Sequence, residues 1–219
     1  MVRVKICGIT REEHLRAAVE AGAAAIGLVV ESNGTPRNLT IEEARNLRRR
    51  TPPFVDAVLV SSCDKLAVIQ KVVEKIHPDF VQLHGIKDVE KLSALERGKG
   101  VGIIVPVSIG SSYAKREQEL ELITKFTEIA RGLLLDASTS KIGGLGKRGD
   151  WIYARQIRDA VYPFPVILSG GLNPTNVSEA IKQVAPYAVD VSSGVESIRG
   201  VKDPTKIFEF IREAHGAIV

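Results

Sequence analysis

Residues 54–83 read FVDAVLVSSCDKLAVIQKVVEKIHPDFVQL, and their hydrophobic pattern indicates the fold class. Its two apolar ends, residues 54–60 and 80–83, have the near-continuous hydrophobic character of parallel strands that are buried on both faces. Between them, residues 65–76 carry apolar side chains at helical spacing. A strand, a helix and a second strand in this order predict a βαβ unit.

The same unit repeats along the whole chain. Eight apolar segments are predicted as strands: residues 2–6, 24–30, 54–60, 80–83, 101–107, 132–135, 165–168 and 188–191. Each precedes an amphipathic segment that is predicted as a helix: residues 11–21, 41–49, 65–76, 89–95, 118–129, 151–160, 176–184 and 205–214. Eight units in 219 residues predict an α/β protein, a single (β/α)₈ TIM barrel that forms one catalytic domain over residues 1–219.

A doubly wound open sheet is the alternative fold. That fold usually carries a glycine-rich phosphate loop directly after its first strand. Here the first predicted strand is followed by Cys7-Gly8-Ile9-Thr10, and the glycine clusters come late in the chain. In a barrel, the carboxyl ends of all strands meet at one mouth, where barrel enzymes place their active sites. We therefore expect six polar residues to meet there: Cys7, His84, Asp136, Ser169, Asp190 and Ser192.

Composition and charge exclude several classes of function. The net charge is only +4, and Lys and Arg are mixed with Asp and Glu, so nucleic-acid binding is not indicated. Cys7 and Cys63 form neither a CxxC pair nor a disulfide framework, which favours a reduced, cytoplasmic setting. No apolar stretch reaches the roughly 18 residues of a membrane span, so no membrane partner is expected. No spacing of His, Cys and acidic residues resembles a metal site.

Two glycine-rich segments predict a phosphate site. Residues 169–174, SGGLNP, offer two glycines that can take positive φ and an Asn-Pro pair suited to a helix N-cap and first turn. Residues 192–196, SSGVE, add hydroxyls and amides and can form a short extra helix. Either segment alone is equally typical of a tight capped loop, but the two together favour phosphate. The phosphate ligands predicted from them are Gly170, Gly171, Ser192, Ser193 and Gly194.

A third glycine-rich segment, residues 142–149, follows the sixth predicted strand. Its composition is also that of a flexible solvent loop. Its place beside the other two segments favours a contact with the ligand, because barrel loops at this end carry function. Gly144 and Gly146 are therefore added to the predicted phosphate site.

Two residues at the mouth are suited to proton transfer. Cys7 and Lys5 share one face of a strand, and a neighbouring cation lowers a thiol pKa, which favours a thiolate. A lone buried cysteine would instead be inert core, and that interpretation is kept for Cys63. Asp136 follows an apolar run, which would raise the pKa of its carboxyl, as suits a general acid. The alternative for Asp136 is a residue that only shapes its turn.

Two further residues are candidates for substrate binding. Arg37 lies on the loop after the second predicted strand, where its guanidinium can hold a carboxylate through two hydrogen bonds. Most loop arginines, however, are only solvated. His84 either contacts the substrate or is a structural histidine with satisfied hydrogen bonds, and its sequence context supports both interpretations equally.

Five motifs closely resemble those of the phosphoribosylanthranilate isomerase family, in order and over nearly the whole chain. They are KICGIT at residues 5–10, VQLHG at 81–85, LLLD at 133–136, SGGLNP at 169–174 and VDVSSGVE at 189–196. The resemblance implies a barrel enzyme of tryptophan biosynthesis that needs no cofactor or metal. The implied reaction is the Amadori rearrangement of N-(5-phosphoribosyl)anthranilate to 1-(2-carboxyphenylamino)-1-deoxyribulose 5-phosphate. The chain departs from the family pattern at residues 29–34 and at Leu145.

Roles follow from the resemblance residue by residue. It implies that Cys7 is the general base, that Asp136 is the general acid and that Arg37 binds the anthranilate carboxylate. His84 and Asp190 match other residues near the substrate, and the glycine loops match the phosphate site. The implied partner is a small phosphosugar, and the implied assembly is a monomer or a homodimer.

Three other functions are alternatives to this one. The aldose–ketose isomerase of the histidine pathway, on the same barrel, is expected to have an acid in place of Cys7. Indole-3-glycerol-phosphate synthase is expected to have an N-terminal extension and a catalytic Lys–Glu set. A non-catalytic barrel that binds a phosphate ligand is expected to lack Cys7 or Asp136. Both residues are present, which favours the isomerase.

Overall fold

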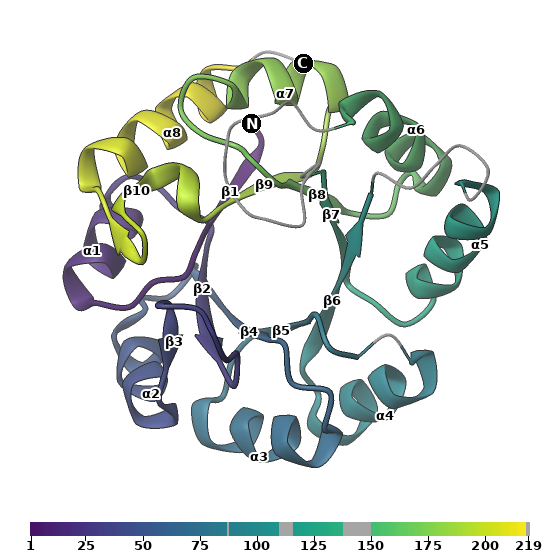
Figure 1. The fold of residues 1–219 in the computed structure, drawn as a ribbon, viewed down its shortest axis with the longest axis horizontal. Coiled ribbons are helices and arrows are strands. Elements are labelled where there is room, and N and C mark those ends of the chain that lie inside the picture. Colours follow the sequence, from purple (N-terminus) through teal and green to yellow (C-terminus); the bar gives the residue numbers. More distant parts are fainter. Residues whose placement is uncertain (87, 110–115, 138–149, 218–219) are drawn as a thin grey trace.

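The computed structural model describes residues 1–86, 88–109, 116–137 and 150–217. Eight parallel strands form a ring (Figure 1): β1 (Arg3–Cys7), β2 (Ala25–Val30), β4 (Asp56–Ser61), β5 (Phe80–Leu83), β6 (Gly102–Ser108), β7 (Gly132–Asp136), β8 (Val166–Ser169) and β9 (Ala188–Val191). Their order is β1-β9-β8-β7-β6-β5-β4-β2, and pairing of β2 with β1 closes the ring. The predicted TIM barrel is confirmed and the open sheet is wrong. The predicted phosphate ligands Gly144 and Gly146 lie outside the described residues.

The helices surround the barrel as an outer ring (Figure 1). They are α1 (Glu12–Glu20), α2 (Ile41–Arg50), α3 (Leu66–Ile76), α4 (Val89–Lys99), α5 (Arg116–Thr127), α6 (Trp151–Val161), α7 (Val177–Val184) and α8 (Pro204–Gly216). Helix α4 ends at Lys99, four residues beyond the predicted end. The prediction stopped early because the last turn is polar and mostly exposed and so carries no hydrophobic signal. In the described ranges, no helix is long and apolar enough to cross a membrane.

Three short strands and one 3-10 turn lie at the mouth of the barrel. A two-residue strand, β3 (Asn38–Leu39), pairs with β2, and β10 (Glu196–Ile198) pairs with β11 (Val201–Lys202) in a small antiparallel hairpin. None of these three strands was predicted, because runs of two or three residues carry no readable periodicity. The predicted extra helix after the last barrel strand is present as a single 3-10 turn, η2 (Ser193–Val195).

Side chains alternate between two cores because successive residues of a strand point to opposite sides. Val4 and Ile6 of β1 belong to the large core between the barrel and its helices. Cys7 belongs to a smaller cluster inside the barrel, with buried members from six other strands including Val58, Ile104 and Leu134. The chemistry-bearing side of β1 therefore faces the barrel interior.

Candidate active site

The Cys7 side chain lies at the carboxyl end of β1 and is 7% exposed. Its neighbour in register on β2 is Gly27. A Cβ atom at position 27 would lie 2.8 Å from the Cys7 Sγ, so a glycine is needed there to leave room for the thiol. No local sequence pattern indicates this role for Gly27, because the contact depends on the register between two strands.

Burial dominates the electrostatics of Cys7. Removal from water raises the pKa of the thiol, and the negative charge of Asp190 acts in the same direction. The positive charges of Lys5 and Lys202 lower that pKa, but the net shift is upward. The prediction that a neighbouring lysine gives Cys7 a lowered pKa is therefore wrong in sign, because desolvation outweighs the charge of Lys5.

A hydrogen-bonded chain links side chains from four strands inside the barrel. Ser169 Oγ donates to one oxygen of Asp190 at 3.0 Å, and Lys5 Nζ donates to the other at 2.8 Å. Lys5 Nζ also donates to Gln82 Oε1 at 3.1 Å, and Gln82 Nε2 donates to His84 Nε2 at 2.9 Å. Burial lowers the pKa of Lys5, but the charges and hydrogen bonds of Asp190 and Cys7 together outweigh it, and the net shift is upward. Lys5 is therefore held as a cation close to Cys7.

His84 is at the accessible end of this chain. Desolvation and the charge of Lys5 lower its pKa, although Asp136 and Asp190 act in the opposite direction. The imidazole is therefore neutral at pH 7, and its Nε2 accepts the Gln82 amide, which leaves the proton on Nδ1. Gln82, in β5, was not predicted, although it lies only two residues before His84.

Asp136 is the last residue of β7 and is half-buried. In register it lies beside Ser108 of β6 and Ser169 of β8. Around the barrel, β8 and β9 separate β7 from β1, so Asp136 and Cys7 reach the mouth from different parts of its rim. The predicted acid and base thus both lie at carboxyl ends of strands.

The two glycine-rich segments lie against each other. Gly170 and Gly171 have φ angles of 95° and 67°, which other residues adopt at a cost. A Cβ atom at Gly194, in η2, would lie 1.9 Å from the carbonyl oxygen of Leu172. Only glycine allows this approach, which joins the loop after β8 to the loop after β9. The predicted phosphate groups of these two segments therefore share one part of the rim.

The helix predicted over residues 176–184 matches α7 within one residue, but the predicted N-cap of this helix is wrong. Asn173 was expected to be the N-cap, with Pro174 as the first helical residue, but α7 begins at Val177. Instead, the Asn173 side chain accepts the amide of Thr175 at 2.9 Å, and Asn176 Oδ1 accepts the amide of Asn173 at 2.8 Å. These two bonds close a separate turn ahead of the helix, and that is the physical reason for the error.

Arg37 is held in a buried ionic cluster. Its Nε and Nη2 atoms donate to the two oxygens of Glu196, both at 2.7 Å. Lys202 Nζ donates to Glu196 Oε1 and to the Ser192 carbonyl, both at 2.9 Å. The amide of Gly200 donates to Glu196 Oε2 at 3.0 Å. Burial opposes ionisation of Glu196, but the partners outweigh it and lower its pKa to about 2.

The same cluster reaches Cys7 through Gly8. A Cβ atom at Gly8 would lie 2.6 Å from Arg37 Cδ and 3.3 Å from Ser192 Oγ. Arg37 thus crosses directly over the residue that follows Cys7, and the departure from the family pattern at residues 29–34 does not remove it from the mouth. Neither Glu196 nor Lys202 was predicted as a site residue, although Glu196 is the last residue of the SSGVE motif.

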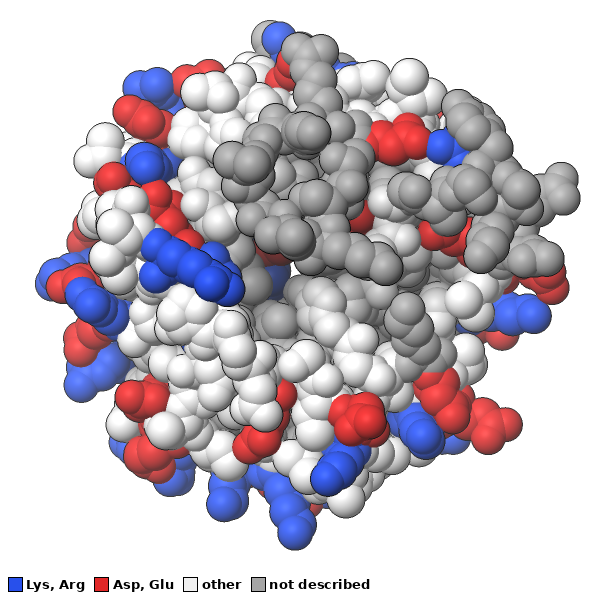
Figure 2. Space-filling model, in the orientation of Figure 1, with Lys and Arg blue, Asp and Glu red and all other residues white. Residues whose placement is uncertain are grey.

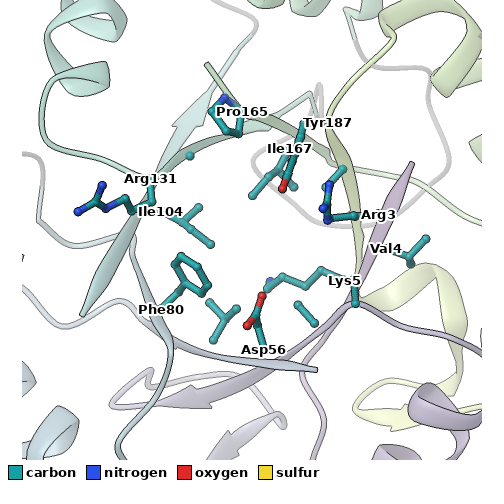
Figure 3. Close-up of a pocket in the computed structure, with 15 residues that line it drawn as sticks. Arg3, Val4, Lys5, Asp56, Phe80, Ile104, Arg131, Pro165, Ile167 and Tyr187 are labelled. Atoms are coloured by element: carbon teal, nitrogen blue, oxygen red, sulfur yellow. The ribbon is translucent and has the colours of Figure 1, made fainter. Parts of the chain in front are cut away.

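The other end of the barrel holds an apolar cavity of about 150 Å³ (Figure 3). Its lining includes Phe80, Ile104 and Ile167, with Arg3 and Tyr187 among the labelled side chains. Several of these residues begin their strands, so the cavity lies at the amino ends, opposite Cys7 and Asp136. It is therefore not the predicted active site.

The described surface carries both signs of charge around its edge (Figure 2). Basic and acidic side chains are interspersed there, in keeping with a net charge of only +4. Within the described ranges, no three His, Cys, Asp or Glu side chains are grouped so that they could hold a metal ion.

Comparison with known proteins identifies the family. The family model described as N-(5'phosphoribosyl)anthranilate (PRA) isomerase matches residues 4–213. The N-(5'-phosphoribosyl)anthranilate isomerase of Methanopyrus kandleri is 44% identical over 217 residues, which cover 97% of this chain and 98% of the relative.

Two solved structures agree with this. Phosphoribosylanthranilate isomerase from Thermotoga maritima has a TM-score of 0.85 at 39% identity, covering 99% of this chain and 100% of that one. A phosphoribosylanthranilate isomerase in complex with reduced 1-(o-carboxyphenylamino)-1-deoxyribulose 5-phosphate has a TM-score of 0.82 at 36% identity, covering 99% of this chain and 100% of that one. The resemblance inferred from the five motifs is confirmed. The chain belongs to the N-(5'-phosphoribosyl)anthranilate isomerase family.

Proposed function

We propose that residues 1–219 form a single catalytic domain that converts N-(5-phosphoribosyl)anthranilate to 1-(2-carboxyphenylamino)-1-deoxyribulose 5-phosphate. Cys7 is the general base and Asp136 the general acid. The observation that carries the proposal is the position of a thiol and a carboxyl at the carboxyl ends of β1 and β7, on the same barrel mouth. Family membership supports the same reaction, in tryptophan biosynthesis.

Groups suited to the two charged ends of this substrate flank β1. The glycine segments after β8 and β9 offer amides for the phosphate, and Arg37, on the loop after β2, offers its guanidinium for the aromatic carboxylate. In the barrel β1 lies between β9 and β2. A substrate held at both ends therefore crosses the carboxyl end of β1, above the Cys7 thiol.

Ring opening and enolamine formation each require one proton transfer. Asp136 protonates the furanose ring oxygen, the C1–O bond breaks, and the nitrogen lone pair forms a Schiff base. The Cys7 thiolate then removes the proton from C2, and the electron pair left behind gives an enolamine. The enolamine takes up a proton at C1 and loses the proton of its C2 hydroxyl, which gives the ketone, so substrate and product have the same atoms. Because burial raises the pKa of Cys7, only a minor fraction of the thiol is ionised before the substrate binds.

The remaining predicted residues support these steps. Neutral His84 has its Nδ1–H available to donate to a substrate hydroxyl at the mouth. Asp190 is 5% exposed, and its two oxygens accept Ser169 and Lys5. We therefore assign Asp190 to the positioning of Lys5 instead of direct substrate binding. Lys5 in turn favours the thiolate form of Cys7.

The test is turnover of freshly made phosphoribosylanthranilate, followed by loss of its anthranilate-type fluorescence. We expect turnover without added metal or cofactor, and none with the aminoaldose substrate of the histidine-pathway isomerase. Binding of phosphoribosylanthranilate without turnover would instead indicate a phosphate-ligand-binding barrel. The proposed role accords with the predicted cytoplasmic location, and monomer and homodimer both stay predictions for the assembly.

A further inference from the structure

Glu196 forms ion pairs with two cations, Arg37 and Lys202, in a largely buried cluster. The side chains of Glu196 and Lys202 are 4% and 0% exposed, and that of Arg37 is 17% exposed. Two cations thus share one carboxylate, which leaves a net positive charge at the rim of the mouth. A buried carboxylate is tolerated only when its oxygens are fully paired, and here four hydrogen bonds reach them.

The geometry of the Arg37 guanidinium leaves one edge available. A guanidinium has five N–H donors in a fixed planar fork. Glu196 takes one donor from Nε and one from Nη2, which together form the side edge of the fork. The three other N–H groups find no acceptor within the described parts of the chain. Two of them, one on each terminal nitrogen, are parallel and suited to a second carboxylate.

We infer that Glu196 is a positioning residue, which holds the side edge of Arg37 so that the end edge is presented to the aromatic carboxylate of the substrate. The inference rests on the proposed function and extends it to a residue that does not itself touch the substrate. Glu196 acts through Arg37, and Lys202 and the Gly200 amide fix the Glu196 carboxylate in turn.

Positioning matters here because of where Arg37 lies. The residue is on a loop, and an arginine side chain has many rotamers, so binding a ligand with an unrestrained arginine loses conformational entropy. Two contacts restrain it before the substrate arrives: the Glu196 pair and the close approach of its Cδ to Gly8. Lys202 also donates to the Ser192 hydroxyl at 3.3 Å, so the same anchor reaches the predicted phosphate groups.

The experiment compares two product analogues in which the ketone is reduced, one with and one without the ring carboxylate. Their dissociation constants are measured by calorimetry for wild type, Glu196→Gln and Glu96→Gln. Glu96 is the matched control, because it pairs with Arg131 at 2.8 Å from helix α4. We expect the wild type to prefer the carboxylate-bearing analogue by about tenfold or more.

In Glu196→Gln this preference should fall to less than about threefold, because an amide nitrogen cannot accept an N–H from Arg37 and carries no charge. KM for the substrate should rise about tenfold while kcat changes less than about threefold, since the carboxylate is charged in both ground and transition states. Glu96→Gln should keep wild-type values for all three quantities.

An unchanged preference in folded Glu196→Gln overturns the inference. If that variant lacks a cooperative thermal transition, Glu196→Asp decides instead. Aspartate keeps the charge that Lys202 needs but withdraws the carboxylate from Arg37 by one methylene, so we expect the same loss of preference. A wild-type preference in Glu196→Asp also overturns the inference. Failure of the proposed function is distinguishable, because the wild type would then show no turnover whatever its preference between analogues.

Discussion

Replacement of Gly8 by alanine tests whether Arg37 must occupy its observed position in order to bind the substrate. Gly8 has a φ of 77°, and a Cβ atom there would lie 2.6 Å from Arg37 Cδ. The usual contact between two carbon atoms is about 3.5–4.0 Å, so either Arg37 or the turn must move by about 1 Å. Ser192 Oγ, at 3.3 Å from the same Cβ, leaves little room on its side. We therefore expect Gly8→Ala to displace the guanidinium.

The change has two costs that can be measured separately. A left-handed backbone costs a residue with a side chain about 1–2 kcal/mol. For a chain of this size each kcal/mol lowers Tm by about 2–4 °C, so the expected loss in Gly8→Ala is about 2–8 °C. A displacement of about 1 Å in a binding group can reduce catalytic efficiency by about 100-fold. Because Arg37 is proposed to bind the substrate, most of this loss should appear in KM.

Gly100→Ala is the matched control. Gly100 follows α4 with a φ of 63°, and a Cβ atom there meets nothing within 4 Å. Both variants should therefore lose stability in thermal unfolding, but only Gly8→Ala should raise KM in the fluorescence assay. Equal KM values for Gly8→Ala, Gly100→Ala and wild type would contradict this expectation, because Arg37 would then be mobile enough to avoid the new methyl group or unnecessary for binding.

Three further outcomes are expected. In a Cys63→Ser background, the thiolate absorbance of Cys7 should appear at higher pH than that of free cysteine, because burial raises its pKa; titration at or below the free value would contradict this. Arg37→Ala should raise KM more than it lowers kcat, and an unchanged KM would remove Arg37 from the site. Inorganic phosphate should compete with substrate without metal and shift the amide resonances of Gly171 and Ser193 in NMR spectra; shifts elsewhere but not there would count against the predicted phosphate site.

The sequence was sufficient for the barrel because the signal is carried by many residues at once. Every barrel strand is predominantly apolar, and the ends predicted for each lie within two residues of those observed. The errors in the predicted helix ends follow from weak or competing signals. The last turn of α4 is polar, and the turn at Asn173 is closed by side-chain hydrogen bonds that hydrophobic periodicity does not report.

The site was predicted only in part, because strand ends are readable from the sequence but partners are not. Cys7 and Asp136 end their strands as expected. The pairing of Arg37 with Glu196 joins residues 159 positions apart, and no local sequence pattern predicts it. The predicted direction of the Cys7 pKa shift was wrong for a related reason. Lys5 was visible as a neighbour, whereas the desolvation that outweighs it depends on the packing of the whole barrel interior.

The most direct test of the central claim is kcat for Cys7→Ser and Asp136→Asn, measured beside calorimetric binding of the reduced product analogue. Both variants should lose about 100-fold or more in kcat, since a hydroxyl is a far poorer base than a thiolate and an amide cannot protonate the ring oxygen. Both should bind the analogue within about threefold of wild type, because the glycine segments and Arg37 are unchanged. A near-normal kcat in either folded variant would contradict the claim and remove that residue from the mechanism.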